Sequence, residues 1–165
     1  MNKGNKPLTP ANALNRAAAL CSRSEQAKAD IAKKLHDWGL ADADAEAVLK
    51  RLVDEKFLDD GRYAVAFVRD KFRFNGWGRR KIAYALRQKG LPQDVIDSAM
   101  CEIDDADYAA MLRRLLEGKV RSLKGKEPRL AKASLLRFAA SRGFEPDLFF
   151  SMVNGLLGSS EDEDW

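Results

Sequence analysis

Apolar residues recur along this chain at helical spacing, and one pattern returns three times. In each copy a helix ends in a glycine followed by an apolar residue, with the glycines at Gly39, Gly90 and Gly143, 51 and 53 positions apart. Such a glycine can adopt the left-handed conformation that ends a helix, and the next residue can pack back on the last turn. Stretches that alternate apolar and polar residues are almost absent, so no strand is predicted. The pattern predicts an all-α fold of tandem three-helix repeats, about nine helices in an elongated array.

The helices on either side of each glycine carry matching apolar positions. One lies eight residues before the glycine, and three lie five, nine and twelve residues after it. Steps of three and four residues share one helical face, so these positions are predicted to form the core. They are Ile31, Ile82 and Leu135 before the glycines, and Ala45, Leu49, Leu52, Ile96, Met100, Ile103, Phe149, Val153 and Leu156 after them.

Two aspartates come before the first helix of the second and third copies. Leu-Asp-Asp-Gly-Arg-Tyr-Ala at Leu58–Ala64 aligns with Ile-Asp-Asp-Ala-Asp-Tyr-Ala at Ile103–Ala109. An aspartate before a helix accepts hydrogen bonds from free backbone N–H groups. We therefore interpret these acid pairs as helix caps rather than catalytic groups, and we expect Tyr63 and Tyr108 to begin the buried stripe of the next helix.

These signals divide the chain into three predicted repeat units, at residues 10–57, 58–103 and 104–157. Residues 1–9 and the acidic tail 158–165 are predicted to be disordered. Pro10 suits a first helical turn, and Ser24 is a partial cap signal for the second helix. The predicted helices are Ala11–Ser22, Ser24–Trp38, Asp42–Lys56, Gly61–Phe74, Gly78–Lys89 and Pro92–Glu102, followed by a third unit from Asp105 to Leu157 with a break at Gly125 to Pro128.

Basic residues are concentrated in two segments, although the net charge is only +4. From Arg69 to Lys89 there are eight basic residues and one acid, and from Arg113 to Arg142 there are ten basic residues and two acids. The segment between them, Pro92 to Ala109, has six acids and no base. The first two helices of the second and third units are therefore predicted to carry the positive surface.

Helical phase turns many of these basic residues away from the predicted core. Clustered arginine suits phosphates and carboxylates because the guanidinium can bind them through two parallel hydrogen bonds. The alternative is that these stripes are ordinary solvated surface. The candidate binding residues are Arg62, Arg69, Arg73, Trp77, Arg79, Arg80, Lys81, Tyr84, Arg87, Arg113, Arg121, Lys124, Lys126 and Arg129.

Trp77 lies in the break Gly76-Trp77-Gly78, next to three basic residues. It either fills the corner between two helices or is an exposed aromatic that stacks on a base or anchors in a partner pocket. The first reading is favoured. Trp38, directly before Gly39, is predicted to be structural.

Residues for catalysis, cofactor binding or metal binding are lacking in the sequence. His36 is the only histidine, Cys21 and Cys101 have no Cys-x-x-Cys partner, and no P-loop or complete dinucleotide-binding loop occurs. We predict a non-enzyme without cofactor or metal, with two buried free thiols, although a disulfide stays possible. No signal peptide or membrane span is recognisable, which predicts a soluble, cytoplasmic protein.

Three motifs follow one another in the middle of the chain: Leu-Asp-Asp-x-x-Tyr-Ala at Leu58–Ala64, Gly-x-Gly-x-Arg-Lys-Ile at Gly76–Ile82 and Leu-x-x-Lys-Gly-Leu at Leu86–Leu91. In this order and spacing they resemble the RecX family, small bacterial regulators of the RecA recombinase. The Leu49-x-x-Leu52-x-x-x-x-Phe57-Leu58 pattern precedes them, and the resemblance covers roughly Ala11 to Phe150.

The resemblance implies a curved rod of three-helix repeats that binds RecA nucleoprotein filaments in their groove. It implies inhibition of RecA ATP hydrolysis, strand exchange and stimulated repressor cleavage. The expected partners are the RecA filament and DNA, single- or double-stranded, within that filament, and the protein itself is expected to be a monomer that does not bind membranes. Two alternatives stay open: a stand-alone nucleic-acid-binding helical module, and a helical-repeat scaffold for an unrelated protein.

Overall fold

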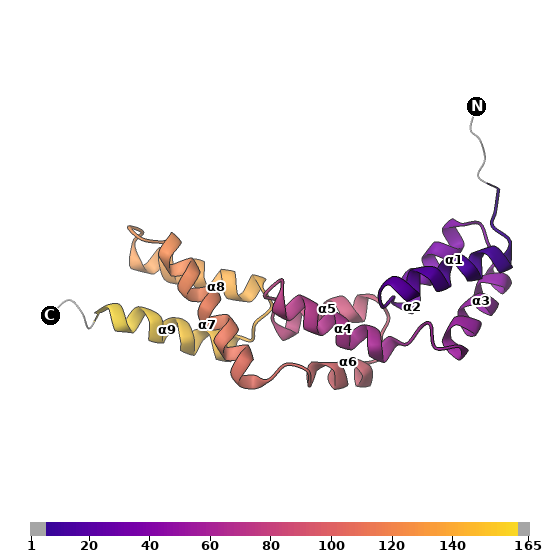
Figure 1. The fold of residues 1–165 in the computed structure, drawn as a ribbon. Helices are drawn as coiled ribbons and strands as arrows, with labels where there is room; N and C mark the ends of the chain where they lie inside the picture. Colours follow the sequence, from indigo (N-terminus) through magenta and orange to yellow (C-terminus); the bar gives the residue numbers. More distant parts are fainter. Residues whose placement is uncertain (1–5, 162–165) are drawn as a thin grey trace, which may run out of the picture. The chain divides into compact units, whose positions relative to one another are not determined.

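Nine α-helices and no strand make up the part of the chain that the computed structural model describes, residues 6–161, with side chains as far as Gly158 (Figure 1). The predicted all-α fold with repeated three-helix units is thereby confirmed. The helices are α1 (Pro10–Arg23), α2 (Lys28–Asp37), α3 (Asp42–Asp54), α4 (Asp60–Arg73), α5 (Arg79–Gln88), α6 (Gln93–Met100), α7 (Asp105–Ser122), α8 (Pro128–Ser141) and α9 (Pro146–Glu161).

The helices belong to two compact parts of the molecule. The first part runs as far as Ala66 and includes Leu86–Ile96, and the second comprises Phe67–Ala85 and the chain from Asp97 onward. The boundary between the parts falls inside α4, α5 and α6. The division into repeats at residues 10–57, 58–103 and 104–157 follows the sequence pattern instead, and it stays a prediction.

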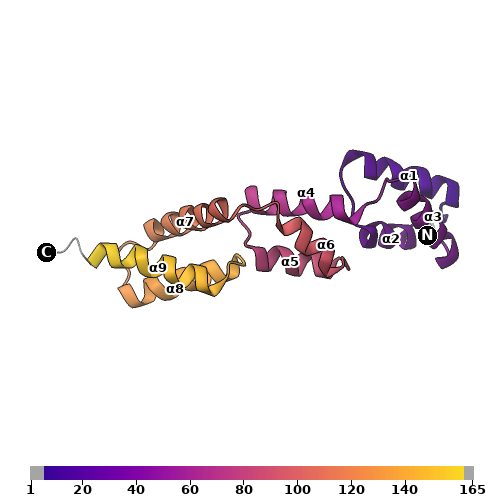
Figure 2. The ribbon, with the colours of Figure 1, turned by 90° about the horizontal axis from the view of Figure 1, so that it is seen from below.

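In the first part, α1, α2 and α3 pack on one another around an apolar core (Figure 2). The Thr9 hydroxyl accepts a hydrogen bond from the Asn12 N–H at 3.2 Å, so α1 begins at Pro10 with a satisfied cap. Trp38 packs against this core with the Arg16 guanidinium 4.7 Å from its ring, which confirms its predicted structural role. The buried core residues are Ala13, Ala17, Ile31, Leu35, Leu40, Val48, Leu52 and Leu58.

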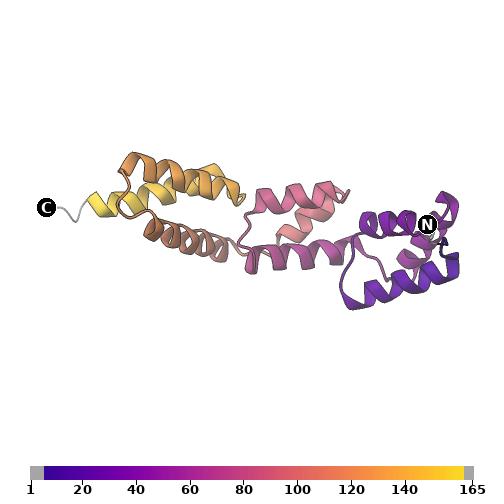
Figure 3. The same cartoon turned by 90° about the horizontal axis from the view of Figure 1, so that it is seen from above.

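In the second part, α7, α8 and α9 pack pairwise (Figure 3). Tyr108 is almost fully buried, as predicted, with its ring centroid 6.0 Å from that of Phe72 and 5.0 Å from that of Phe144. Offset aromatic contacts at these distances add to the free energy gained from burial. Other buried residues of this part are Leu112, Leu116, Leu135, Ala139, Phe149 and Val153.

All three repeat glycines end a helix in the same way. Each has a positive φ, +87° at Gly39, +77° at Gly90 and +91° at Gly143. At each site the glycine N–H donates to the carbonyl three residues back, and the following apolar N–H donates to the carbonyl five residues back. These two bonds form the Schellman motif, and the apolar residue after each glycine is buried. The predicted left-handed caps are confirmed.

The Asp-Asp steps also act as predicted. Asp59 Oδ1 accepts from the Arg62 N–H at 3.0 Å, and Asp104 Oδ2 accepts from the Asp107 N–H at 3.1 Å. The second aspartate of each pair bonds another helix. Asp60 accepts from the first N–H of α2, and Asp105 accepts from Arg79, the first residue of α5. The acid pairs therefore cap one helix and fix the start of another within the same part of the molecule.

Three sequence predictions need correction. The second helix begins at Lys28, not Ser24, since Ser24 and the fully buried Ala27 both have extended backbone dihedral angles. Residues 158–161, predicted to be disordered, continue α9, whereas the acidic residues 162–165 lie outside the described residues, as do 1–5. Residues 6–9 lead into α1 and are fixed by the Leu8 N–H, which donates to the Trp38 carbonyl at 3.1 Å.

Candidate functional site

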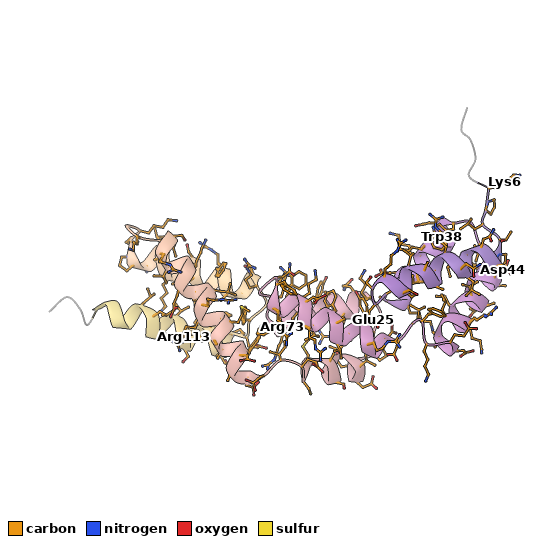
Figure 4. The ribbon with its side chains drawn as sticks, in the orientation of Figure 1. Lys6, Glu25, Trp38, Asp44, Arg73 and Arg113 are labelled. Carbon is orange, nitrogen blue, oxygen red and sulfur yellow. The ribbon has the colours of Figure 1, made fainter. Side chains whose placement is uncertain are left out.

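The three candidate arginines of α4 differ in their surroundings. Arg62 pairs with Glu25 at 3.0 Å, and Arg69 pairs with Glu102 at 2.6 Å. The Glu25 Oε2 atom is buried and has no hydrogen-bond partner in the described chain, so Arg62 compensates a half-desolvated carboxylate. Only Arg73, labelled in Figure 4, is exposed without an ion pair among the described residues. All three arginines are exposed, as predicted, but the two partner acids come from elsewhere in the sequence, so the charges along α4 alone do not reveal these ion pairs.

Trp77 fills the corner between α4 and α5. Its ring meets Phe67 edge to face at 6.3 Å, and the Lys71 and Lys81 ammonium groups lie 4.9 and 4.5 Å from its centroid. Cation–π contacts of this kind stabilise both partners. Trp77 is half-buried and already surrounded, which matches the favoured structural reading.

Arg79 is the most constrained of the candidate residues. Its N–H donates to the Tyr108 hydroxyl at 3.0 Å, and its guanidinium donates to Asp105 at 2.7 Å and to the Ile103 carbonyl at 3.3 Å. The same guanidinium lies 4.1 Å from the Tyr108 ring centroid. Arg79 thus ties the start of α5 to the start of α7.

The Tyr108 hydroxyl in turn donates to Glu145 Oε2 at 2.6 Å. Burial, and then this hydrogen bond, raise the pKa of Tyr108 well above its usual value. Because the neutral hydroxyl serves both as donor and acceptor, it links the starts of α5 and α7 to the α8–α9 turn.

A close backbone contact joins the α4–α5 turn to the α8–α9 turn. The Gly78 N–H donates to the Arg142 carbonyl at 2.6 Å, and the Arg80 N–H donates to the Gly143 carbonyl at 3.0 Å. A Cβ atom on Gly78 would lie 2.4 Å from the Gly143 carbonyl carbon. Position 78 therefore requires glycine because the backbone at Gly143 lies so close, and not because of the φ angle of Gly78.

The predicted outward face of α5 is confirmed. Arg80 and Arg87 are exposed, and Tyr84 between them is 63% exposed. Arg87 donates to Gln93 at 2.9 Å, whereas Arg80 has no ion-pair partner among the described residues. Lys81 lies on the flank of this face and reaches Trp77.

A groove of about 330 Å³ lies between α5 and the α8–α9 turn. Arg80, Lys81 and Tyr84 contribute one wall, and the apolar part comes from Phe144, Pro146 and Phe149. No acidic residue lines it. A larger hollow of about 550 Å³ over α3 is lined by both acids and bases, such as Glu46 and Lys50, and so favours no charge.

The five candidate basic residues of the third predicted unit are all exposed, as helical phase predicts for Arg113, Arg121 and Lys124. None of them forms an ion pair with another described side chain, and Arg113 is labelled on α7 in Figure 4. Four of the five cluster around the turn that joins α7 to α8. The set is Arg113, Arg121, Lys124, Lys126 and Arg129.

Sequence reasoning passed over two residues of the second part. Phe74 is 83% exposed at the end of α4, and its off-phase position relative to Val68 and Phe72 was the available signal. Arg142 donates to the Asn75 carbonyl at 2.7 Å and lies 5.3 Å from the Phe138 ring centroid. No sequence signal marks Arg142, because its partner is 67 residues away.

Neither cysteine forms a disulfide, but the predicted burial is wrong for Cys101, which is exposed at the end of α6. Cys21 is half-buried, and burial, with the nearby Glu25, raises its pKa. Within the described residues, no group of histidine, cysteine or acidic side chains is arranged to hold a metal ion. None of the described helices is both long and apolar enough to cross a bilayer.

Comparison with known proteins identifies the family. A family model described as "RecX, second three-helix domain" matches residues 59–100, from the Asp-Asp step to the end of α6. The chain is 34% identical to the regulatory protein RecX of Vibrio campbellii, over 90% of each chain. It belongs to the RecX family.

Other RecX proteins give the same picture. Identity is 35% with the regulatory protein RecX of Prosthecochloris aestuarii, covering 88% of this chain and 93% of the relative, and 32% with that of Pseudomonas entomophila, covering 89% and 93%. The crystal structure of RecX from Lactobacillus salivarius superposes with a TM-score of 0.78 at 18% identity, over 89% of this chain and 96% of that one. A second crystal structure, of regulatory protein RecX, superposes with a TM-score of 0.80 at 24% identity, over 87% and 72%. At these identities the structures support the RecX fold alone.

Proposed function

We propose that this RecX-family chain binds RecA nucleoprotein filaments in their helical groove and inhibits RecA ATP hydrolysis, strand exchange and stimulated repressor cleavage. The observation that carries the proposal is the set of exposed basic side chains without acidic partners, on the turn joining α7 to α8 and on α5. A RecA filament offers DNA phosphates and protein carboxylates, which are the groups that unpaired arginines bind most strongly.

The structure also sorts the candidate residues into two groups. Arg62, Arg69 and Arg79 are engaged in ion pairs within the chain, so their contribution is to hold the helices in place. Arg73, Arg80 and the five exposed basic residues in and around the α7–α8 turn form no ion pair among the described residues, and we propose that they meet the filament. The proposed mechanism is steric and electrostatic, because the bound chain bridges RecA protomers and occludes their groove.

The test is RecA ATPase activity on single-stranded DNA with the protein titrated in, together with co-sedimentation on the filaments. We expect ATPase activity to fall as the protein accumulates on filaments. Arg80→Ala with Arg87→Ala should weaken both effects, while Arg51→Ala, an exposed arginine on α3, serves as the control. Undiminished ATPase without co-sedimentation would contradict the proposal.

The second candidate is a stand-alone nucleic-acid-binding module, which the charge of the same side chains favours. It predicts tight binding to duplex DNA without RecA, with affinity falling steeply as salt rises. Negligible binding to free DNA, with filament binding lost in the Arg80 and Arg87 variant, would exclude this candidate.

A further inference from the structure

We infer that the groove between α5 and the α8–α9 turn is a nucleotide-binding subsite that stacks a base of single-stranded nucleic acid on Tyr84 and holds its phosphate with Arg80. The inference rests on the proposed function in that it names the part of the filament that this surface meets. Two features of the groove carry it, its size and the chemistry of its walls.

The exposed tyrosine at the rim is the first observation. Tyr84 lines the groove and yet leaves 63% of its surface open, although its neighbours Ile82 and Leu86 are fully buried. Its hydroxyl has no hydrogen-bond partner among the described residues. An exposed, unpaired aromatic ring beside a cavity offers a stacking face that any base can use.

The charge of the walls is the second observation. Arg80 and Lys81 line the groove, and no acidic side chain does. The two acids next to Pro146 in sequence do not offset this positive charge. Glu145 accepts a hydrogen bond from the Tyr108 hydroxyl at 2.6 Å, and Asp147 does not line the groove. Lys81 contacts Trp77, so Arg80 is the cation left to bind a phosphate, through two hydrogen bonds in fixed geometry.

The apolar floor completes the match. Phe144 and Phe149, which are buried, and the half-buried Pro146 face a cavity of about 330 Å³. This volume is at the small end of the range for ligand pockets, roughly 300–1,000 Å³. It suits one flat base with part of its sugar.

The walls of the groove argue against an extended peptide as the occupant. Such a peptide gains affinity by pairing with the free backbone groups of a sheet edge, and the helical parts of these walls, in α5, α8 and α9, offer no such edge. A nucleotide needs no such edge.

The groove is also held rigidly, which favours stacking. The Gly78 and Arg80 N–H groups bond the Arg142 and Gly143 carbonyls, so α5 and the α8–α9 turn keep a fixed spacing. A preformed cavity binds a base without the entropic cost of ordering its own walls.

The experiment measures binding of the full chain to fluorescein-labelled oligothymidylate and to an abasic oligomer of equal length and charge, by fluorescence anisotropy without RecA. We expect the wild-type protein to bind the base-bearing oligomer more tightly. Tyr84→Ala should weaken that binding at least about fivefold while changing abasic binding less than twofold, because only stacking is lost. Tyr84→Phe should retain nearly all of the affinity.

Two further variants separate charge and general damage from stacking. Arg80→Gln should weaken binding of both oligomers alike, because it removes a phosphate contact. Phe74→Ala truncates an aromatic that is 83% exposed but does not line the groove, and should change neither affinity. Oligomers containing 5-iodouracil should crosslink to Tyr84, as peptide mapping would show.

Three results would overturn the inference: equal wild-type affinity for the base-bearing and abasic oligomers, no effect of Tyr84→Ala, or an equal effect of Tyr84→Ala and Phe74→Ala. If Tyr84→Ala weakens filament co-sedimentation but not oligomer binding, the groove binds protein and the inference also fails. The proposed function stands or falls separately, on whether the wild-type protein sediments with RecA filaments and lowers their ATPase activity.

Discussion

At the scale of single residues, two positions concentrate the local physical chemistry. Tyr108 is a buried hydroxyl with both a donor and an acceptor role, and Lys56 is a non-glycine residue with a positive φ of 62°. Lys56 ends α3 with the same pair of backbone bonds that the repeat glycines make, since the Phe57 N–H donates to the Leu52 carbonyl at 2.8 Å. Tyr108 stabilises the fold through its hydrogen bonds, whereas the strained backbone at Lys56 destabilises it.

Replacing Tyr108 with phenylalanine should destabilise the fold by about 2 kcal/mol at neutral pH. The change leaves the Arg79 N–H without its acceptor and Glu145 without its donor, while the ring packing is kept. Urea unfolding measures the effect, and Tyr84→Phe, which removes an exposed hydroxyl, should cost almost nothing. Equal stabilities of the two variants would show that the hydroxyl network is not stabilising.

The contribution of the Tyr108 hydroxyl should also be visible in the pH dependence of stability. The folded pKa of Tyr108 is raised above its unfolded value near 10, so its contribution is fully present below about pH 10 and is lost as pH rises further. Wild-type stability, followed by urea unfolding from pH 8 to 11.5, should therefore fall more steeply than that of Tyr108→Phe. Lys89, whose pKa is also raised by its hydrogen bond to Asp30, contributes equally to both proteins, and parallel curves would contradict the assignment to Tyr108.

Lys56→Gly should stabilise the protein by about 1 kcal/mol. Glycine adopts the left-handed conformation freely, whereas a residue with a Cβ pays about 1–2 kcal/mol there, partly offset by glycine's larger loss of entropy on folding. The matched control is Lys33→Gly, at an exposed position inside α2, which should cost about 1 kcal/mol. Thermal unfolding should show a higher midpoint for Lys56→Gly and a lower one for Lys33→Gly. A lower midpoint for both variants would contradict the strain argument.

At the scale of the elements, the α4–α5 turn can contact the α8–α9 turn only because glycines, which have no Cβ atom, lie at the point of contact. Gly78 and Gly143 let two backbones approach within hydrogen-bonding distance, and Arg79, Tyr108 and Glu145 link the same elements through side chains. The apolar repeat made each helix predictable. It did not reveal this joint, because no periodic pattern encodes the contact between distant loops.

Gly78→Ala should destabilise the protein by about 2–3 kcal/mol, since the new Cβ would overlap the Gly143 carbonyl group. Gly118→Ala is the opposite control, because Gly118 lies within α7 and its nearest neighbour to a new Cβ is Arg121 at 3.9 Å. There alanine should stabilise by about 0.5–1 kcal/mol. Urea unfolding of both variants tests the contrast, and a neutral Gly78→Ala would mean that the two turns can separate at little cost.

At the scale of the molecule, the proposed function depends on the distribution of charge and not on the net charge. A net charge of +4 says little, yet the α7–α8 turn holds a cluster of cations without acidic partners among the described residues. Several arginines that look equivalent in sequence are neutralised by partners within their own part of the molecule. The surface available to a partner is therefore smaller than the sequence suggested.

Neutralising Arg121, Lys124 and Lys126 to glutamine should weaken binding to RecA filaments and reduce its salt dependence. Each lost phosphate contact lowers the slope of log affinity against log salt by about 0.7–0.9, so three should lower it by about 2. Arg23, Lys33 and Lys34, changed to glutamine together, remove the same charge from α1 and α2 and should leave the slope almost unchanged. Co-sedimentation at several salt concentrations gives both slopes, and equal losses would mean that net charge alone matters.

The helices apart from the start of α2, the glycine caps, the Asp-Asp caps, most of the buried positions and the family could all be predicted from the sequence. These features depend on contacts between residues close in the chain, or on periodicity, and both can be read from one sequence. It also indicated correctly that Arg80, Tyr84 and Arg87 are exposed, since helical phase alone decides this. Three features follow from tertiary packing alone: the ion pairs of Arg62, Arg69 and Arg79, the contacts of Trp77 with two lysines, and the groove between α5 and the α8–α9 turn. Glu25 and Arg62, or Tyr108 and Glu145, meet because packing brings distant segments together, and no local rule specifies such a contact.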